Sequence, residues 1–151
     1  MSSRPVSPKT SFAPALNAAY RCLIAAMMTK VAGCGFGDMT PAFAALIPLL
    51  DPGGAGARAT DLAQRSGVSK QAMSKLVREL QTRGYVEQAS DPADTRAKIV
   101  RLTKRGIALR TACAGCQHEI IAAALRALGA TRLKRLERDL TDLATALGAV
   151  R

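Results

Sequence analysis

Apolar residues recur at helical spacing in the stretch 69–82. Four of them share one face of a predicted helix, at positions i, i+3, i+4 and i+7: Met73, Leu76, Val77 and Leu80. The opposite face is polar and basic, and it consists of Ser69, Lys70, Gln71, Ser74, Lys75 and Arg78. Ser69 has a side chain suited to cap the helix. The pattern therefore predicts a helix that buries one side and exposes basic and amide groups on the other.

A shorter helix is predicted just before it, over residues 61–65. Thr60 is expected to cap this helix, with Leu62 and Ala63 facing inward. Residues 66–68 (SGV) break the pattern, because Gly67 tolerates a left-handed turn. Two short helices joined by a three-residue turn with a glycine form a helix-turn-helix, whose second helix is shaped for the major groove of DNA.

The next stretch predicts a β-hairpin. Residues 85–89 and 98–102 have strand character, with Val100 and Leu102 on one face and Arg101 on the other. Residues 90–97 between them are rich in Asp and Pro, so we expect a projecting loop. An amphipathic helix or a hairpin is commonplace by itself. Together, in this order and with these exposed bases, they predict a DNA-binding helix-turn-helix with a β-wing.

Helices are predicted on both sides of this unit. A long helix is expected over 11–32, with Pro14 in its first turn, and another over 41–50 that begins at Thr40-Pro41. Residues 51–56 (DPGGAG) predict a turn into the helix-turn-helix. After the hairpin, Thr103 is expected to cap a helix that reaches residue 128. Gly129 breaks it, and Thr131 is expected to cap the last helix.

The last helix carries a leucine seam with alternating steps of three and four, formed by Leu133, Leu136, Leu140, Leu143 and Leu147. Its outer face offers two ion pairs, Arg135 with Asp139 and Arg138 with Asp142, each worth a few tenths of a kcal/mol. The seam can pack on its own domain. We favour a homodimer interface, because the helices at both chain ends have more apolar surface than a small winged helix can cover.

The predicted fold class is mainly α (α+β), a winged helix-turn-helix with a two-stranded β-wing and long N- and C-terminal dimerisation helices. At 151 residues the chain is expected to form one domain. Residues 1–10, rich in Ser, Pro and Lys, are expected to be a disordered tail. Residues 11–36 and 103–151 form the predicted dimerisation region, and residues 37–102 the DNA-binding region.

The charge distribution supports a polyanionic partner. The formal net charge is +11, and residues 58–105 hold eleven Lys and Arg against five Asp and Glu.

A membrane partner is not expected, because no run of eighteen apolar residues exists. Residues 31–34 (VAGC) imitate a lipoprotein processing site, but Arg21 and Lys30 interrupt the apolar stretch that export requires. We expect a cytoplasmic protein whose four cysteines are reduced.

Residues 59–105, which contain the predicted helix-turn-helix and β-hairpin, resemble the winged helix of MarR-type transcriptional regulators. Their pattern opens with Thr-x-Leu-Ala, has Gly-Val-Ser-Lys-Gln at the turn and Leu-x-x-x-Gly-Tyr/Leu-Val, and ends with Asp-x-Arg before Val-x-Leu-Thr. The matching segments here are 60–63, 67–71, 80–86, 91–96 and 100–103. Thr95 departs from the pattern, since many members have a second arginine there. The resemblance implies that the first, fifth and sixth helices interlock across a two-fold axis.

The resemblance also implies a candidate effector site. Family members often bind small phenolic or lipophilic molecules between the dimer helices and the winged helix, where Tyr20, Phe36 and Phe43 are expected to lie. Cys22 lies in the first helix, where peroxide-sensing members carry a reactive cysteine. The residues around it match that subgroup poorly, so no role is transferred to it.

The predicted DNA-contacting residues are Ser69, Lys70, Gln71, Ser74, Lys75 and Arg78 on the second helix, with Asp94, Arg96 and Lys98 on the wing. Gln71 has an amide that can bond an adenine edge twice, and Lys75 or Arg78 can donate to guanine or phosphate. Arg96 is expected at the wing tip, with Asp94 orienting its guanidinium. In related regulators such an arginine enters the minor groove beside each half-site.

Cys113 and Cys116, with His118 close by, form a Cys-x-x-Cys cluster. It could act as a thiol sensor, as a dithiol catalyst or as a metal site. No second ligand pair has matching spacing, and the motif lies in a predicted helix, so structural cysteines are favoured and no metal ligand is assigned. A redox or metal-binding protein with thiol–disulfide activity remains the alternative interpretation.

No catalytic residue or cofactor is predicted. His118 has no nucleophile oriented by a third group, and the glycines of 53–56 lack the Gly-Lys-Ser/Thr of a phosphate loop. The predicted function is therefore that of a sequence-specific regulator of transcription, a repressor rather than an enzyme. It is expected to bind a double-stranded, palindromic operator as a homodimer, with release by a small-molecule effector or by thiol oxidation.

Overall fold

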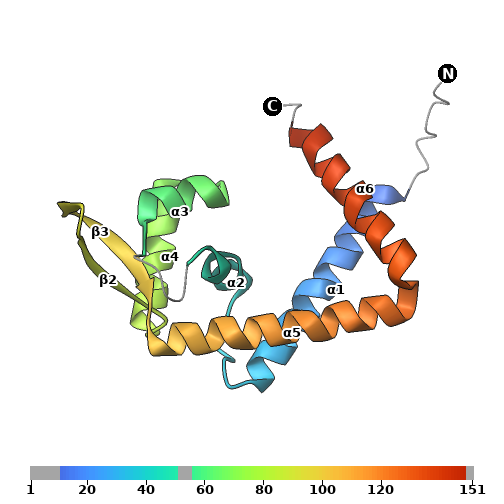
Figure 1. Cartoon of the computed structure of the whole chain (residues 1–151), viewed down its shortest axis with the longest axis horizontal. Helices are drawn as coiled ribbons and strands as arrows, with labels where there is room; N and C mark the ends of the chain where they lie inside the picture. Colours follow the sequence, from blue (N-terminus) through green and yellow to red (C-terminus); the bar gives the residue numbers. More distant parts are fainter. Residues whose placement is uncertain (1–10, 51–55, 149–151) are drawn as a thin grey trace.

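The computed structural model describes residues 11–50 and 56–148. A winged-helix lobe lies at one end and a helical region at the other, and one long helix, α5, runs between them (Figure 1). The elements follow in this order: α1 (Phe12–Gly33), α2 (Pro41–Leu46), the 3₁₀ turn η1 (Ile47–Leu49), β1 (Ala57–Arg58), α3 (Ala59–Ser66), α4 (Lys70–Thr82), β2 (Val86–Asp91), β3 (Asp94–Leu102), α5 (Lys104–Leu128) and α6 (Ala130–Gly148). The predicted fold class is confirmed.

The sheet has three antiparallel strands in the order β1-β3-β2. In the hairpin Val86 pairs with Leu102 and Ser90 with Lys98, and the register shifts between Ser90 and Asp91. The projecting loop predicted over 90–97 is therefore wrong. Its backbone joins the ladder almost to the tip, because the carboxylate of Asp91 accepts the Ala93 amide hydrogen at 2.9 Å and closes a tight turn.

The third strand, β1, has no sequence signal, since two residues are too short to show alternation. Ala57 pairs with Val100, and Arg58 pairs with Ile99. β3 is therefore the central strand, and the wing has a short partner on its other side. The chain leaves β1 directly into α3, because Arg58 is still extended (φ −69°, ψ 144°) and Ala59 is the first helical residue.

Two predicted helix caps, Ser69 and Thr103, are confirmed, and Thr40 at the predicted start of its helix is also a cap. The side-chain oxygens of Thr40, Ser69 and Thr103 accept backbone amide hydrogens three residues later, at 3.4, 3.1 and 3.1 Å. Two others are wrong. Thr60 lies inside the first turn of α3, because the helix already starts after Arg58. Thr131 lies inside α6, which begins at Ala130, directly after the turn at Gly129 (φ 74°).

The helix predicted over 41–50 stops early. α2 ends at Leu46 and continues as the 3₁₀ turn η1. Pro48 explains the change, because it has no amide hydrogen to donate four residues back and its ring crowds the preceding turn. The turn predicted over 51–56 falls mostly on 51–55, which lie outside the described residues.

The core lies in the winged-helix lobe. Its largest fully buried side chains are Tyr85, Phe43, Leu46, Ile47, Leu50, Leu62, Met73, Leu80 and Leu109. The predicted stripe of α4 is confirmed, with Met73, Val77 and Leu80 buried and Leu76 packed against them at the edge. α1 adds Val31, and α5 adds Leu109 and Cys116. α6 has no buried residue in its described length.

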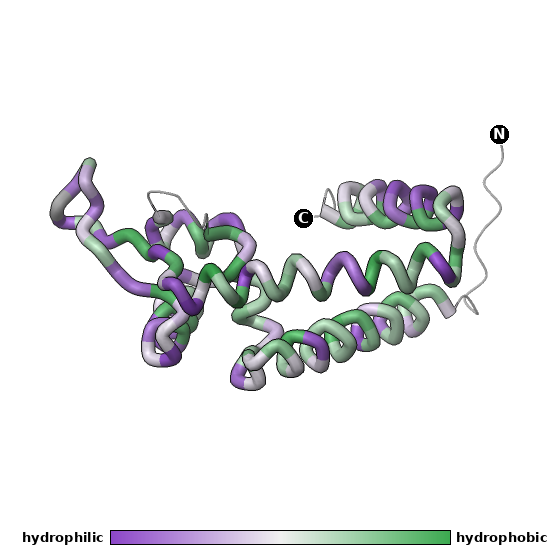
Figure 2. Tube along the Cα trace, turned by 60° about the horizontal axis from the view of Figure 1, so that its bottom comes forward, coloured by the Kyte–Doolittle hydropathy of each residue, from purple (hydrophilic) through white to green (hydrophobic). Residues whose placement is uncertain are grey.

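The long helices expose large apolar side chains instead. On α1, α5 and α6 these are Phe12, Leu16, Tyr20, Leu23, Ile107, Ile121, Leu125, Leu136, Leu140 and Leu147. Figure 2 shows apolar residues along most of α1. Within 11–50 and 56–148, no helix is both long enough and apolar enough to cross a membrane.

Candidate nucleic-acid interface

α4 presents the basic face predicted from its sequence. Lys70, Gln71, Ser74, Lys75 and Arg78 are all exposed, and Ser69 is exposed at the helix start. The Ser74 hydroxyl donates to the Lys70 carbonyl at 2.8 Å, and the Lys75 ammonium lies 4.0 Å from the Glu79 carboxylate. Gln71 and Arg78 are exposed on the same face of the helix.

α3 and the turn hold α4 in this orientation. Gly67 adopts a left-handed conformation (φ 67°), which lets the Val68 amide hydrogen bond back to the Ala63 carbonyl at 3.1 Å. Leu62 and Ala63 are buried in the same core as the inner stripe of α4. The second helix is therefore held by packing on one side and free on the other, as a groove-binding helix requires.

The three predicted wing residues are exposed on β3, but the role of Asp94 is different. Its carboxylate accepts the backbone amide hydrogen of Arg96 at 3.1 Å and lies 3.8 Å from the guanidinium of Arg58. The prediction that Asp94 orients the Arg96 guanidinium is wrong, because the carboxylate serves the backbone of the turn. The side chains of Arg96 and Lys98 are exposed on the strand.

Arg58 on β1 is a supporting residue that the sequence did not indicate. Its guanidinium contacts the Asp91 carboxylate with nitrogen–oxygen distances of 2.8 and 2.6 Å. The pKa of Asp91 is lowered, first by the bond from the Ala93 backbone amide and then by the bond from Arg58. The same pair raises the pKa of Arg58. This contact ties the wing to the strand that leads into α3.

A second cluster joins the helix-turn-helix to the long helices. The Tyr85 hydroxyl donates to the Asp38 carboxylate at 2.5 Å, and the Arg105 guanidinium lies 3.2 Å from the same carboxylate. Arg83 donates to the Asp38 backbone carbonyl at 2.7 Å. The Tyr85 bond, with Arg105 and Arg83, lowers the pKa of Asp38. Burial raises the pKa of Tyr85, and the bond to Asp38 adds to the effect. The cluster thus links the segment after α1, the end of α4 and the start of α5.

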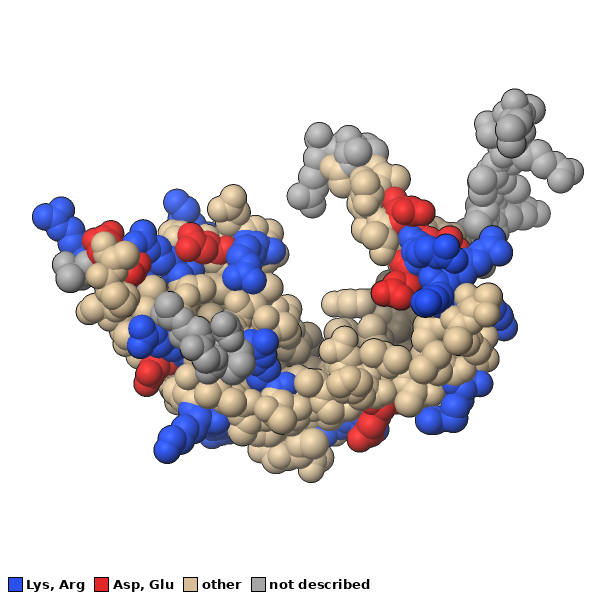
Figure 3. All heavy atoms as spheres, viewed as in Figure 1, with Lys and Arg blue, Asp and Glu red and all other residues tan. Residues whose placement is uncertain are grey.

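Lys and Arg side chains gather over α3, α4 and the wing (Figure 3). A second group lies at the corner between α5 and α6, where it is mixed with acidic side chains. Acidic side chains also lie on the winged-helix lobe, but residues 58–105 have eleven Lys and Arg against five Asp and Glu. This excess places positive potential on the surface that also carries the exposed face of α4.

An apolar pocket of about 430 Å³ lies between α1, α2 and α5. Its polar groups are Tyr20, Cys113 and Gln117, and among the described residues its wall has no charged side chain. Tyr20 is where the effector prediction put it. Phe43 is instead fully buried in the core, and Phe36 packs against it, with its ring centre 6.2 Å from that of Tyr85.

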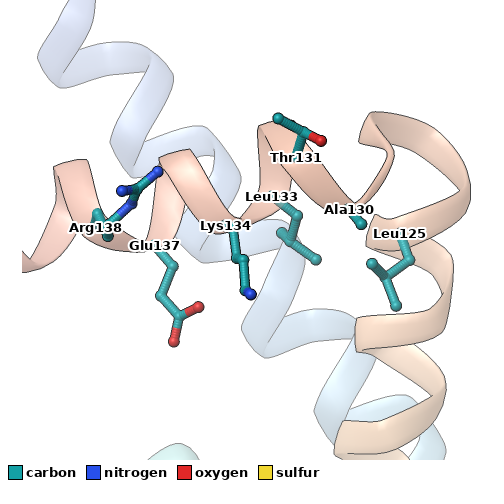
Figure 4. Close-up of a pocket in the computed structure, with 7 residues that line it drawn as sticks. All are labelled: Leu125, Ala130, Thr131, Leu133, Lys134, Glu137 and Arg138. Carbon is teal, nitrogen blue, oxygen red and sulfur yellow. The ribbon is translucent and has the colours of Figure 1, made fainter.

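A further hollow of about 420 Å³ lies in the angle between α5 and α6. Leu125 and Leu133 project into this angle, with Lys134 and Glu137 beside them (Figure 4). Leu136 and Leu140 of the predicted seam are exposed. Of the two predicted ion pairs of α6, Arg135–Asp139 is present at 3.7 Å, whereas Arg138–Asp142 is absent from the described part of the helix. The inner side of α6 thus has apolar side chains that its own chain leaves uncovered.

The cysteine cluster differs from the predicted grouping. Cys113 is half-buried and Cys116 is buried, and burial raises the pKa of both thiols. The neighbouring Cys34 thiol at the end of α1 adds to the rise in the pKa of Cys116, while His118 is exposed. Sequence spacing could not find Cys34, because it lies far away along the chain. Within residues 11–50 and 56–148, no three His, Cys, Asp or Glu side chains are grouped to hold a metal.

Comparison with known proteins identifies the architecture. The sequence model of the MarR family matches residues 39–97. No curated protein matches the chain. Among solved structures, the MarR family transcription regulator SP03579 is 21% identical, with a TM-score of 0.78, covering 93% of this chain and 90% of its own. FabT of Streptococcus pneumoniae, in complex with DNA, is 14% identical with a TM-score of 0.80, covering 93% and 97%.

PcaV of Streptomyces coelicolor, solved in complex with its natural ligand, is 20% identical with a TM-score of 0.69, covering 97% of this chain and 99% of its own. At these identities the similarity establishes a shared fold, which extends over both the winged helix and the long helices. The family match covers the stretch from Met39 through the helix-turn-helix to the wing. The chain is thus similar to the MarR family in sequence over residues 39–97, and it shares the fold of the MarR family transcription regulator SP03579 along most of its length.

Proposed function

We propose that this protein is a sequence-specific DNA-binding regulator of transcription, and that it acts as a repressor. The exposed face of α4 is the observation that carries the proposal. Gln71, Lys75 and Arg78 are exposed on this face, beside a basic wing, and the opposite face of the helix packs into the core. Side chains of these types donate to base edges and phosphates in a major groove.

The proposed DNA-binding unit is a homodimer on a palindromic operator. Two copies related by a two-fold axis place two α4 helices in successive major grooves, about one helical turn of DNA apart. The apolar surfaces of α1, α5 and α6 supply the contact between copies, because large apolar side chains line each of them. A dimer seated on a promoter represses by occupying the site that the transcription machinery needs.

The proposed effector is a small, uncharged, lipophilic molecule that binds in the pocket between α1, α2 and α5. The pocket offers a hydroxyl, a thiol and an amide within an otherwise apolar wall. It touches both the long helices and α2 of the winged-helix lobe, so a ligand there can favour one arrangement of the two over another. The ligand-bound PcaV supports an effector for this fold.

The first test locates the operator and then asks what Gln71 contributes. Footprinting on the DNA beside the protein's own gene is expected to protect an inverted repeat. Gln71→Ala is expected to relax base preference at one position of each half-site, with a loss of ~1–3 kcal/mol for the cognate base. Titration of duplexes that carry each base at each position measures this preference.

Gln81→Ala is the matched control, because Gln81 is an exposed glutamine in the last turn of the same helix. It is expected to keep the base preference of the unmodified protein. If Gln71→Ala and Gln81→Ala have identical base preferences, α4 does not recognise the sequence through Gln71. If footprinting finds no protected repeat at the protein's own or any other promoter, the proposed function fails.

A further inference from the structure

Two backbone connections join the winged-helix lobe to the long helices, and the one between β3 and α5 is tightly bonded. The Thr103 backbone amide donates to the Tyr85 carbonyl at 3.0 Å. The Thr103 hydroxyl donates to the carbonyls of Gly84 and Tyr85 at 2.5 and 3.2 Å. α5 therefore leaves the lobe from a point that the backbone itself fixes.

The other connection lies between α1 and α2 and contains three glycines, at positions 33, 35 and 37. Gly35 is left-handed (φ 91°) and turns the chain away from α1. Gly37, directly before Asp38, has no such conformation, and a Cβ there would meet nothing within 4 Å. A glycine that neither backbone shape nor space requires leaves the chain freer than another residue would. This connection therefore depends on side-chain contacts to keep a fixed course.

Asp38 makes those contacts, with donors from two other parts of the chain. Its carboxylate accepts from the Tyr85 hydroxyl at 2.5 Å and from Arg105 at 3.2 Å, and its backbone carbonyl accepts from Arg83 at 2.7 Å. Arg105 also donates to the Tyr85 hydroxyl at 3.1 Å, and its guanidinium lies 4.5 Å from the centre of the Tyr85 ring. These four residues form one network, the Asp38 cluster, at the point where both connections meet the lobe.

Apolar packing also joins the long helices to the lobe, through Val31, Leu109 and Cys116. The hydrophobic effect is non-directional, whereas a hydrogen bond weakens steeply when it bends. The bond from Tyr85, followed by the nearby arginines, lowers the pKa of Asp38, so the carboxylate is ionised at neutral pH. Hydrogen bonds to an ionised acceptor are the stronger ones. The Asp38 cluster is therefore a directional link between the lobe and the long helices.

In the proposed dimer, the angle of each lobe determines how far apart the two α4 helices lie. The long helices supply the contact between copies, and each lobe extends from the end of α5 (Figure 1). One more base pair between two half-sites moves a half-site by about 3.4 Å and turns it by about 35°. A dimer with lobes at a fixed angle thus matches one spacing, whereas lobes that swing match several.

We propose that Asp38 is a positioning residue that determines the half-site spacing accepted by the dimer, because it fixes the angle of each lobe. This inference rests on the proposed function, but it concerns the spacing of the half-sites rather than the bases that α4 contacts. Asp38 acts here through Tyr85 and Arg105.

The test uses the operator found by footprinting, in duplexes whose centre is lengthened or shortened by one or two base pairs. Each duplex is titrated with the unmodified protein and with Asp38→Asn, which keeps the size of the side chain and removes its charge. We expect the unmodified protein to lose about tenfold in affinity per base pair of altered spacing, as for a mismatched base pair, and Asp38→Asn about threefold or less. A loss of stability alone would weaken binding to every duplex by the same factor. The ratio of affinities between duplexes therefore separates positioning from folding.

Tyr85→Phe tests the same cluster from the other side, because it removes the hydroxyl and keeps the buried ring. It is expected to lose the spacing preference as Asp38→Asn does, and the double variant is expected to lose no more, since both changes remove one shared contact. Glu119→Gln is the matched control. Glu119 pairs with Lys30, so its carboxylate links α1 to α5 without contacting the lobe. This variant is expected to keep the spacing preference.

Circular dichroism checks the fold of each variant, and if Asp38→Asn does not fold, Tyr85→Phe decides. Spacing ratios equal to those of the unmodified protein would overturn the inference. So would an equal loss of preference in Glu119→Gln, or an unmodified protein that accepts every spacing equally. In each of these cases the operator is still bound, so the proposed function stands and only the role of Asp38 fails. If the unmodified protein binds no repeat at any spacing, the proposed function itself fails.

Discussion

At the scale of single residues, Gly106 sets how closely α5 approaches the wing. It lies in the first turn of α5, where a Cβ would be 2.0 Å from the Tyr85 carbonyl oxygen. That carbonyl cannot move freely, because it already accepts the backbone amide hydrogen of Thr103 at 3.0 Å. The direction in which α5 leaves the sheet thus depends on a missing side chain as much as on the cap at Thr103.

We expect Gly106→Ala to destabilise the fold by about 1–3 kcal/mol, because the new methyl group meets the backbone rather than a flexible side chain. Gly115→Ala on the same helix is the control. A Cβ there would meet nothing within 4 Å, and alanine favours a helix by about 0.5–1 kcal/mol over glycine. Urea unfolding of the three proteins measures both effects. Equal midpoints for Gly106→Ala and the unmodified chain would show that the backbone relaxes without cost.

At the scale of elements, the sequence predicted those features that depend on residues close together along the chain. The buried stripe of α4, the turn at Gly67 and the caps at Ser69 and Thr103 follow from residues within a few positions of each other. The tip of the wing could not be predicted in this way, since Arg58 stabilises it from 33 residues away. For the same reason the contact of Asp38 with Arg105, 67 residues further along the chain, had no signal in the sequence.

The wing gives a prediction at this scale. Arg96→Ala is expected to weaken binding to all duplexes, most at operators flanked by A/T tracts, because their narrow minor groove attracts arginine. The salt slope of binding is expected to fall by about one unit for each phosphate that the variant no longer neutralises, summed over both copies. Titrations of labelled duplexes at several salt concentrations measure affinity and slope together.

Arg126→Ala is the matched control, because this arginine is exposed in the last turn of α5, on a different element from the wing. It removes the same charge and is expected to leave the A/T preference unchanged. An Arg96→Ala protein with the affinity and salt slope of the unmodified chain would mean that the wing does not touch DNA.

At the scale of the molecule, the distribution of apolar surface is uneven. The winged-helix lobe contains most of the core, whereas the described part of α6 buries no residue. An isolated amphipathic helix of this length has marginal stability in water, and most helices depend on packing of their apolar face. The leucine seam could be predicted from its spacing alone, but its exposure in a single chain required the structure.

We expect the double variant Leu136→Glu/Leu140→Glu to be monomeric, because both side chains are exposed on the seam and carboxylates there would be desolvated in a dimer. Thr145→Glu is the control, since residue 145 lies on the opposite side of α6 and is exposed. It is expected to remain dimeric. Sedimentation velocity measures both. A monomeric unmodified chain, or a double variant that stays dimeric, would contradict the assignment of α6 to the interface.

The short strand β1 limits how the DNA-binding parts can move. It pairs with β3 of the wing and continues without a break into α3, which packs on α4. The Arg58–Asp91 ion pair adds a side-chain contact between β1 and the wing. We therefore expect the wing and α4 to move together. In the proposed complex an effector cannot release one groove and keep the other: both contacts engage or disengage together, so DNA binding becomes an all-or-none event for each half-site.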